Sequence, residues 1–184
     1  MVKYTYFTDG AATMKRKNGK YLREAGGWAF ILLKDGVEDS YHCGGCPLTT
    51  NNEMELYAIY ASMKDFILKS ESGDIIEICS DSSYCIDIFT KWAKGWQKRG
   101  WRKSDGKQIR NLDIIKAVWR LMGEINKKSC ILKFVKVKGH SSNIWNNKAD
   151  KLAVDAKNDA FKSRKTTYYA ENDGFLGGKS KYAD

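Results

Sequence analysis

Residues Tyr4–Gly10 read Tyr-Thr-Tyr-Phe-Thr-Asp-Gly, and this stretch decides how the rest of the chain can fold. Aromatic and β-branched residues occupy both alternating faces, which is typical of a strand covered on both sides in the middle of a sheet. The last side chain before the glycine is a carboxylate, Asp9, and a buried carboxylate needs a partner. We interpret that partner as a metal ion, with an ordinary Asp-Gly turn as the alternative. The other carboxylates must decide between the two.

Length and composition predict one globular domain, because 184 residues of which 42% are hydrophobic can bury a core without disulfides or a structural metal. Lys and Arg outnumber Asp and Glu by 32 to 22, which indicates a polyanionic partner or simply a basic surface. No stretch reaches the roughly 18 apolar residues of a membrane span, and the N-terminus lacks the apolar run of a signal peptide. We therefore expect a cytoplasmic protein without membrane contact, acting as a monomer with no obligate protein partner.

The cysteines are odd in number and are interpreted as reduced thiols, so no disulfide is expected. A zinc or redox pair in the Cys-Gly-Gly-Cys stretch is the alternative, but no second pair completes four zinc ligands. The five are Cys43, Cys46, Cys79, Cys85 and Cys130.

The order of patterns along the chain predicts an α/β fold that opens with three antiparallel strands. After the first strand, apolar runs at 26–33 and 37–43 form the second and third, joined by a short turn. Strands at 75–80 and 131–137 then alternate with helices at about 51–69, 81–92, 109–126 and 143–161. Thr50 followed by Glu53 has the form of a capping box. We expect a domain at 1–162 and a polar, flexible tail at 163–184.

Two basic segments interrupt this pattern. Residues 11–25 carry five cations and an Asn-Gly pair, which predicts a long hairpin connection. Its base must lie next to Asp9, so we expect it to add positive charge beside that carboxylate, with a plain surface hairpin as the alternative. Residues 92–110 interleave three tryptophans with lysines and arginines, and we expect this segment to lie outside the core.

Three further acids fall where predicted elements begin or end. Glu55 lies in the first turns of a helix, Asp81 closes a buried strand, and Asp150 lies inside the last helix. Asp9 and Asp81 would stand side by side at the carboxyl ends of adjacent parallel strands. Taken singly, Glu55 and Asp150 could be ordinary helix-surface acids. Taken together, clustered carboxylates need a shared proton or a cation, and an all-oxygen site suits Mg²⁺ or Mn²⁺.

An ordered set of motifs makes residues 2–161 resemble type 1 ribonuclease H. The motifs are Thr8-Asp9-Gly10, the run 49–56 (Thr-Thr-Asn-Asn-Glu-Met-Glu-Leu), Ser80-Asp81-Ser82, Lys138-Gly139-His140 and the run 146–150 (Asn-Asn-Lys-Ala-Asp). The resemblance implies a ribonuclease H-like fold, with a five-stranded mixed sheet flanked by helices. It also implies endonucleolytic hydrolysis of the RNA strand of RNA–DNA hybrids, leaving 5′-phosphate and 3′-hydroxyl ends. Two Mg²⁺ ions, for which Mn²⁺ can substitute, would be held by Asp9, Glu55, Asp81 and Asp150.

The same resemblance implies further residue roles. His140 lies in a glycine-containing loop, and its near-neutral pKa suits a proton shuttle for product departure. Thr50 would hold a DNA-strand phosphate, Asn51 and Asn52 would contact the minor groove, and Trp92 would line the DNA channel. Residues 96–103 resemble the basic protrusion of the family. The full set of implied substrate contacts is Gly10, Thr50, Asn51, Asn52, Trp92, Trp96, Lys98, Arg99 and Trp101.

The chain departs from the family pattern at two places. The basic segment 13–23 replaces a glycine- and proline-rich loop that carries an RNA-contacting asparagine, and we expect its cations to compensate by extending the positive surface along the RNA strand, the strand that is cleaved. Gly95 stands where an asparagine often precedes the second tryptophan. Because Asp9 lies so near Met1, we also expect no separate N-terminal hybrid-binding domain. Two other readings stay open: a nucleic-acid-binding module without catalysis, and a resolvase or transposase of the same fold.

Overall fold

Strands and helices alternate along the chain after an opening run of strands in the computed structural model, which describes residues 1–139, 142–170 and 174–176. In chain order the elements are β1 (Lys3–Ala12), β2 (Lys15–Lys17), β3 (Lys20–Leu22), β4 (Glu24–Lys34), β5 (Val37–Thr49), α1 (Asn51–Lys69), β6 (Ile75–Ser80), α2 (Ser83–Asp87), the π-helical turn η1 (Ile88–Trp92), α3 (Ala93–Lys98), α4 (Leu112–Lys127), β7 (Ile131–Lys136) and α5 (Ile144–Ser163).

Strand β1 lies in the middle of a five-stranded sheet with the order β5-β4-β1-β6-β7. The pairs β1/β4 and β4/β5 are antiparallel, whereas β1/β6 and β6/β7 are parallel. Tyr6 packs into the main core on one face of β1, and Phe7 packs into a second cluster on the other face. The predicted mixed sheet and the central position of this strand are therefore confirmed.

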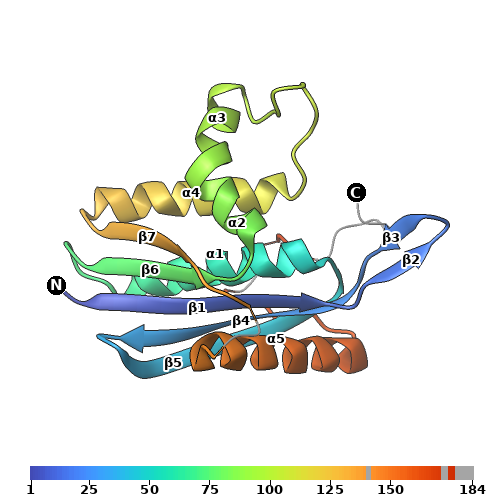
Figure 1. Ribbon diagram of the computed structural model, residues 1–184, viewed down its shortest axis with the longest axis horizontal. Helices are drawn as coiled ribbons and strands as arrows, with labels where there is room; N and C mark the ends of the chain where they lie inside the picture. The colour runs from blue at the N-terminus through green and yellow to red at the C-terminus, as the bar shows by residue number, and fades with distance from the viewer. Residues whose placement is uncertain (140–141, 171–173, 177–184) are drawn as a thin grey trace.

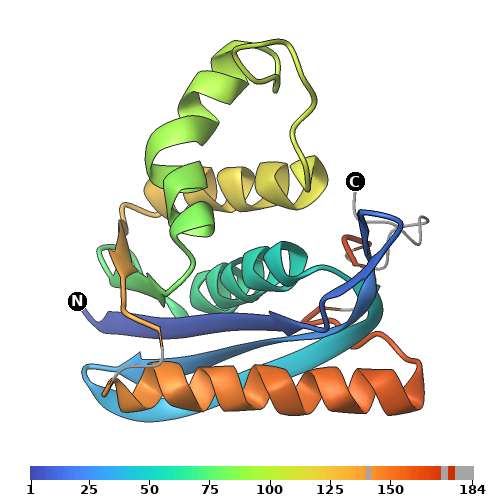
Figure 2. The ribbon, with the colours of Figure 1, turned by 45° about the vertical axis from the view of Figure 1, so that its right-hand side comes forward.

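The sheet is covered on both faces by helices. Helix α5 lies against one face, and α1 lies against the other with α4 packed beyond it (Figures 1 and 2). Gly27 in β4 allows α5 to come close, because a Cβ at this position would overlap the backbone of Ala153 and Lys157. No helix within the described part of the chain has both the length and the apolarity required to cross a membrane.

Helix α1 begins where the capping pattern predicted. The Thr50 hydroxyl accepts a hydrogen bond from the Glu53 amide at 3.2 Å. The Glu53 carboxylate also accepts hydrogen bonds from Arg23 and from the Thr49 hydroxyl. The start of α1 is thereby tied to the strand that precedes it and to the residue before β4.

The basic segment after β1 forms a short hairpin, β2 and β3, that projects from one end of the sheet (Figure 1). Asn18 and Gly19 at its tip both have positive φ, at 50° and 76°. Asn-Gly is favoured where both central residues of a tight turn take this conformation. The predicted hairpin connection and its turn are confirmed.

The tryptophan-rich segment differs from the prediction. The helix expected to end near Trp92 continues through η1 and α3 to Lys98, and it stands out from the rest of the molecule (Figure 2). Trp96 is only 9% exposed and belongs to the main core, as does Ile109. The expectation that this whole segment lies outside the core was wrong, because Trp96 and Ile109 pack inward, whereas Trp92 is 38% exposed and the cations between the tryptophans are exposed.

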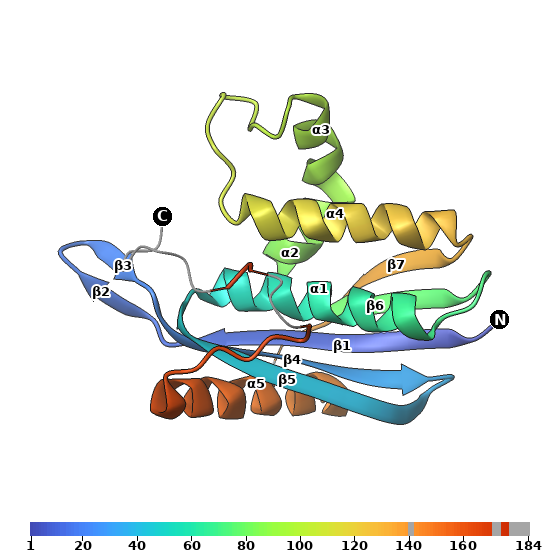
Figure 3. The same cartoon turned by 180° about the vertical axis from the view of Figure 1, so that it is seen from behind.

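The segment that follows α5 also differs from the flexible tail that we predicted. The Thr167 amide donates to Gly45 in β5, and the Tyr169 amide donates to the Tyr57 hydroxyl in α1. Figure 3 shows this segment leaving α5 and crossing β5 toward α1. Leu176 is buried in the main core. The described part of the tail is therefore packed on the domain, because its aromatic and aliphatic side chains outweigh its polar composition.

Candidate active site

Asp9 lies in β1, and its carboxylate is almost fully buried at 4% exposure. Its Oδ1 accepts a hydrogen bond from the Gly10 amide at 2.8 Å. A Cβ at Gly10 would overlap the backbone of Met54 and Glu55. The glycine after Asp9 therefore lets the first turns of α1 approach the strand that carries the carboxylate.

Glu55 reaches the same place from α1. Its side chain is buried, and its Oε2 has no hydrogen-bond partner among the described residues. A buried carboxylate oxygen without a partner costs free energy that a bound cation would offset. This unpaired atom is the feature of the site that most directly indicates a cation-binding role.

Asp81 directly follows β6, and the register of β1 with β6 places it next to Asp9, since Thr8 is paired with Ser80. The Asn146 amide group donates to Asp81 Oδ2 at 3.4 Å, and the Lys136 ammonium donates to the Asp81 carbonyl oxygen. The carboxylate is thus oriented by α5, and its backbone is held by β7. The parallel strands place this acid where the sequence predicted it.

The three carboxylates form one compact group, in which one oxygen from each lies within 4.8 Å of the others. Burial, followed by the charge of Asp81, raises the pKa of Asp9 to about 7. Burial and the charges of Asp9 and Asp81 raise the pKa of Glu55 well above its ordinary value. The group therefore retains protons near neutral pH unless a cation replaces them. Its all-oxygen donor set fits a hard divalent ion such as Mg²⁺ or Mn²⁺.

The two remaining predicted catalytic residues, Asp150 and His140, are not part of the three-carboxylate group. Asp150 lies half-buried on α5 outside the three-carboxylate group, but its charge helps to raise the pKa of Asp9. His140 falls outside the described residues. Gly139, the residue before it, lies beside the Asp81 carboxylate, because a Cβ there would be 2.5 Å from Asp81 Oδ2.

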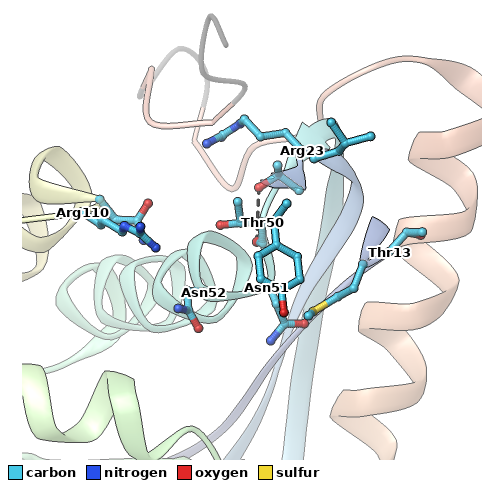
Figure 4. Close-up of a pocket in the computed structure, with 11 residues that line it drawn as sticks. Thr13, Arg23, Thr50, Asn51, Asn52 and Arg110 are labelled. Atoms are coloured by element: carbon cyan, nitrogen blue, oxygen red, sulfur yellow. Dashed lines mark hydrogen bonds between the residues drawn. The ribbon is translucent and has the colours of Figure 1, made fainter. Parts of the chain in front are cut away.

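The predicted substrate residues at the start of α1 line a cleft beside the carboxylates. Thr50, Asn51 and Asn52 all face it, and Asn51 Oδ1 also accepts a hydrogen bond from the Ala12 amide at 3.1 Å (Figure 4). Trp92 and Trp96 line the neighbouring surface. These residues are therefore brought together by the fold, close to Gly10.

The other predicted contacts lie on the protrusion, residues 96–103. Lys98 and Arg99 are exposed near the end of α3. Trp101 is half-buried, with its ring 6.2 Å from that of Trp119 in α4 and Lys116 over its face. The structure thus places Trp101 against α4, away from the cleft at the start of α1.

Sequence reasoning missed the residues that hold the site together. Asn146, which orients Asp81, was quoted only as part of a motif, although it lies four positions before Asp150 and so shares its helix face. The buried pair of Arg23 and Glu53 joins positions 30 residues apart, and no local pattern indicates it.

Comparisons with known proteins agree with this fold. The RNase H family model matches residues 1–158. Ribonuclease H of Erythrobacter litoralis is 37% identical over 156 residues, covering 85% of this chain and 96% of that protein. Ribonuclease H of Acetivibrio thermocellus is 35% identical over 156 residues, covering 84% and 95%.

Solved structures share the same architecture. LC9-RNase H1, a type 1 RNase H with the type 2 active-site motif, has a TM-score of 0.65 at 22% identity, with 90% of this chain and 74% of that chain covered. The solution structure of the PFV RNase H domain has a TM-score of 0.67 at 16% identity, with 86% and 96% covered. At these identities the structures support the fold alone. The family model and the curated relatives show more: this chain is an enzyme that belongs to the ribonuclease H family.

Proposed function

We propose that this ribonuclease H hydrolyses the RNA strand of RNA–DNA hybrids with two divalent ions, Mg²⁺ or in its place Mn²⁺. The ions would be held by Asp9, Glu55, Asp81 and Asp150. The observation that carries the proposal is the group of three carboxylates, two buried and one (Asp81) half-buried, in which one Glu55 oxygen is unpaired and the pKa of Asp9 is raised to about 7. Ionised carboxylates this close repel one another, and bound protons or cations reduce that repulsion.

The residues of the site would position the reacting atoms without a covalent intermediate. When bound, two divalent ions activate the attacking water and stabilise the charge on the leaving oxygen of an in-line displacement. Asp9 and Asp81 are fixed by the paired ends of β1 and β6, and Asn146 orients Asp81. Water attack on phosphorus with loss of the 3′-oxygen leaves a 5′-phosphate and a 3′-hydroxyl. All the ligands come from one chain, so a monomer suffices.

His140 would supply the proton for the departing product. It follows Gly139, which lies beside Asp81, so its loop begins at the carboxylates. An imidazole with an ordinary pKa is partly protonated near neutral pH, and a positioned general acid accelerates such a step.

The substrate contacts would come from the start of α1 and from the protrusion. Thr50, Asn51 and Asn52 border the cleft, and Gly10, a further proposed contact, directly follows Asp9 in β1. Trp92 and Trp96 line the adjoining surface, and the Lys98 and Arg99 cations would pair with phosphates. Trp101, the remaining proposed contact, packs its ring against Trp119 in α4.

A cleavage assay tests the proposal. End-labelled RNA–DNA hybrid, double-stranded RNA, single-stranded RNA and branched DNA are compared with and without Mg²⁺. Cleavage of the hybrid's RNA strand alone, lost in Asp9→Asn and Asp81→Asn, is expected. Cutting of branched DNA would instead favour a resolvase-like activity, and hybrid binding without cleavage would favour a binding module.

A further inference from the structure

A cleft of about 380 Å³ lies between the β2–β3 hairpin and the start of α1 (Figure 4). One wall is apolar and comes from the hairpin, where Met14, Tyr21 and Leu22 line the cleft. Its floor is polar and includes Thr50, Asn51 and Asn52. Apolar and hydrogen-bonding surfaces side by side suit a nucleotide, which offers a flat apolar face and a polar backbone.

The hairpin carries positive charge beside this cleft. The Arg16 guanidinium lies 4.3 Å from the centre of the Tyr21 ring, and Tyr21 is 42% exposed. Lys15 is paired with Glu24 at 3.6 Å, whereas no acid lies within ion-pair distance of Arg16 or Lys17 among the described residues. Arg110 faces the cleft from the other side of the start of α1. These cations fit a polyanionic ligand.

The hairpin is anchored at its base rather than attached as a loose loop. Arg23, which directly follows β3, is 9% exposed and forms a buried ion pair with Glu53 in α1. The Thr13 amide donates to the Ala25 carbonyl at 3.0 Å, which closes the base of the hairpin. The Arg23 Nε is buried without a hydrogen-bond partner among the described residues, although Arg23 lines the cleft. An acceptor entering the cleft would relieve part of that cost.

The cleft continues toward the protrusion. Asn52 and Arg110 also line a second hollow, shared with Trp92, Trp96 and Lys103. The two hollows therefore form one surface that runs from the hairpin, past the start of α1, to the tryptophans. A single extended strand could follow it.

None of Asp9, Glu55 and Asp81 lines either hollow. A strand lying in them passes beside the carboxylates and is not the strand that reaches them. If the RNA strand is the one cut, as under the proposed function on which this step depends, the strand in the hollows is the DNA strand.

We propose that the β2–β3 hairpin is an accessory arm that binds the DNA strand of the hybrid. Arg16 and Lys17 contact its phosphates, and Tyr21 supplies an aromatic face at the mouth of the cleft. The buried pair of Arg23 and Glu53 positions the arm over the start of α1. This differs from our expectation for the hairpin, which located its contacts along the cleaved strand.

The first test compares a variant that lacks two cations of the arm with a control variant that lacks two cations of α4. Arg16→Ala/Lys17→Ala is compared with Arg120→Ala/Lys127→Ala, which removes one arginine and one lysine from exposed positions on α4, outside both hollows. Hybrid binding is followed by fluorescence anisotropy in EDTA over a range of salt concentrations. Each lost phosphate contact should flatten the plot of log affinity against log salt by about 0.9 units, so a decrease of about one to two units is expected for the arm and none for the control. An unchanged slope in the arm variant would overturn the proposal.

The second test identifies the strand. Single phosphates of the DNA strand, and separately of the RNA strand, are replaced by neutral methylphosphonates. At least one DNA position should weaken binding by the wild-type protein but not by Arg16→Ala/Lys17→Ala, because that variant has already lost the contact. Such a position found only in the RNA strand would overturn the assignment.

Hybrid cleavage by the wild-type protein is measured in parallel. No cleavage would refute the proposed function and this inference with it, whereas cleavage with unaltered binding by the arm variant would refute the arm alone.

Discussion

Two buried glutamates stand two positions apart on the first turns of α1, and their surroundings are opposite. Glu53 is bonded to Arg23 and, at 2.7 Å, to the Thr49 hydroxyl. Glu55 is equally buried, at 5% exposure, but faces Asp9 and Asp81 and keeps one oxygen unpaired. A cation, Arg23, lies against the first glutamate, whereas the charged groups that raise the pKa of the second are the carboxylates of Asp9 and Asp81. The comparison shows that burial alone does not mark a functional acid; the absence of a protein partner does.

The largest expected difference between the two glutamates is in catalysis. Glu55→Gln should lower single-turnover cleavage of a hybrid in saturating Mg²⁺ by roughly 10³-fold or more, because losing a metal ligand removes several kcal/mol of stabilisation of the leaving charge. Glu53→Gln is the matched variant, and its single-turnover rate at saturating substrate should stay within about threefold of wild type. Near-normal cleavage by Glu55→Gln would contradict the proposal that Glu55 is a metal ligand and Glu53 is not.

The next effect is the pH dependence of the stability of the metal-free protein. The pKa of Asp9 is raised to about 7 in the folded state, so its contribution to stability is full below its ordinary value and is lost as the pH rises through about 7. The free energy of unfolding in EDTA should therefore fall between about pH 4 and pH 7, by up to about 4 kcal/mol from this group, and level off above that range.

Chemical denaturation at several pH values measures this fall. Asp9→Asn should flatten it, and Mg²⁺ should restore stability mainly at the alkaline end, where the carboxylates are ionised. A metal-free stability that rises through this range would show that the carboxylates are not in mutual repulsion.

A smaller effect is expected on stability from the other glutamate. Glu53→Gln should lower the free energy of unfolding by about 3 kcal/mol, because it leaves the buried Arg23 guanidinium without its counter-charge. Glu24→Gln is the control, since its partner Lys15 is largely exposed and such pairs contribute at most about 1 kcal/mol. Equal losses of unfolding free energy in the two variants would mean that the buried pair of Arg23 and Glu53 stabilises the fold no more than an exposed pair does.

The sheet and the three-carboxylate group could be predicted because each depends on a short local pattern. A strand that is apolar on both faces must be central, and acids at the same level of adjacent parallel strands must meet, which is how Asp9 in β1 and Asp81 just after β6 come together. Gly10 follows Asp9 in the sequence, but only the structure shows that it lets α1 and Glu55 come within reach.

The rest depends on contacts between distant segments. Arg23 appeared in the sequence as one of five cations on a hairpin, yet it is buried because Glu53 lies opposite it after the chain has passed through two long strands. Trp96 and the segment after α5 were misjudged for a related reason. Their neighbours in sequence are polar, and only tertiary packing shows that the aromatic side chains lie in or on the core.

The most direct test of the central claim is calorimetric titration of Mg²⁺ into the wild-type protein at about pH 6.5, in two buffers with different ionisation enthalpies. Because the buried carboxylates hold protons that the metal must displace, binding should release roughly one proton, seen as a difference in heat between the buffers. Glu53→Gln should give the same release, and Glu55→Gln should lose the binding. Identical heats in both buffers for the wild-type protein, or equal behaviour of the two variants, would contradict the assignment of these carboxylates as the metal site.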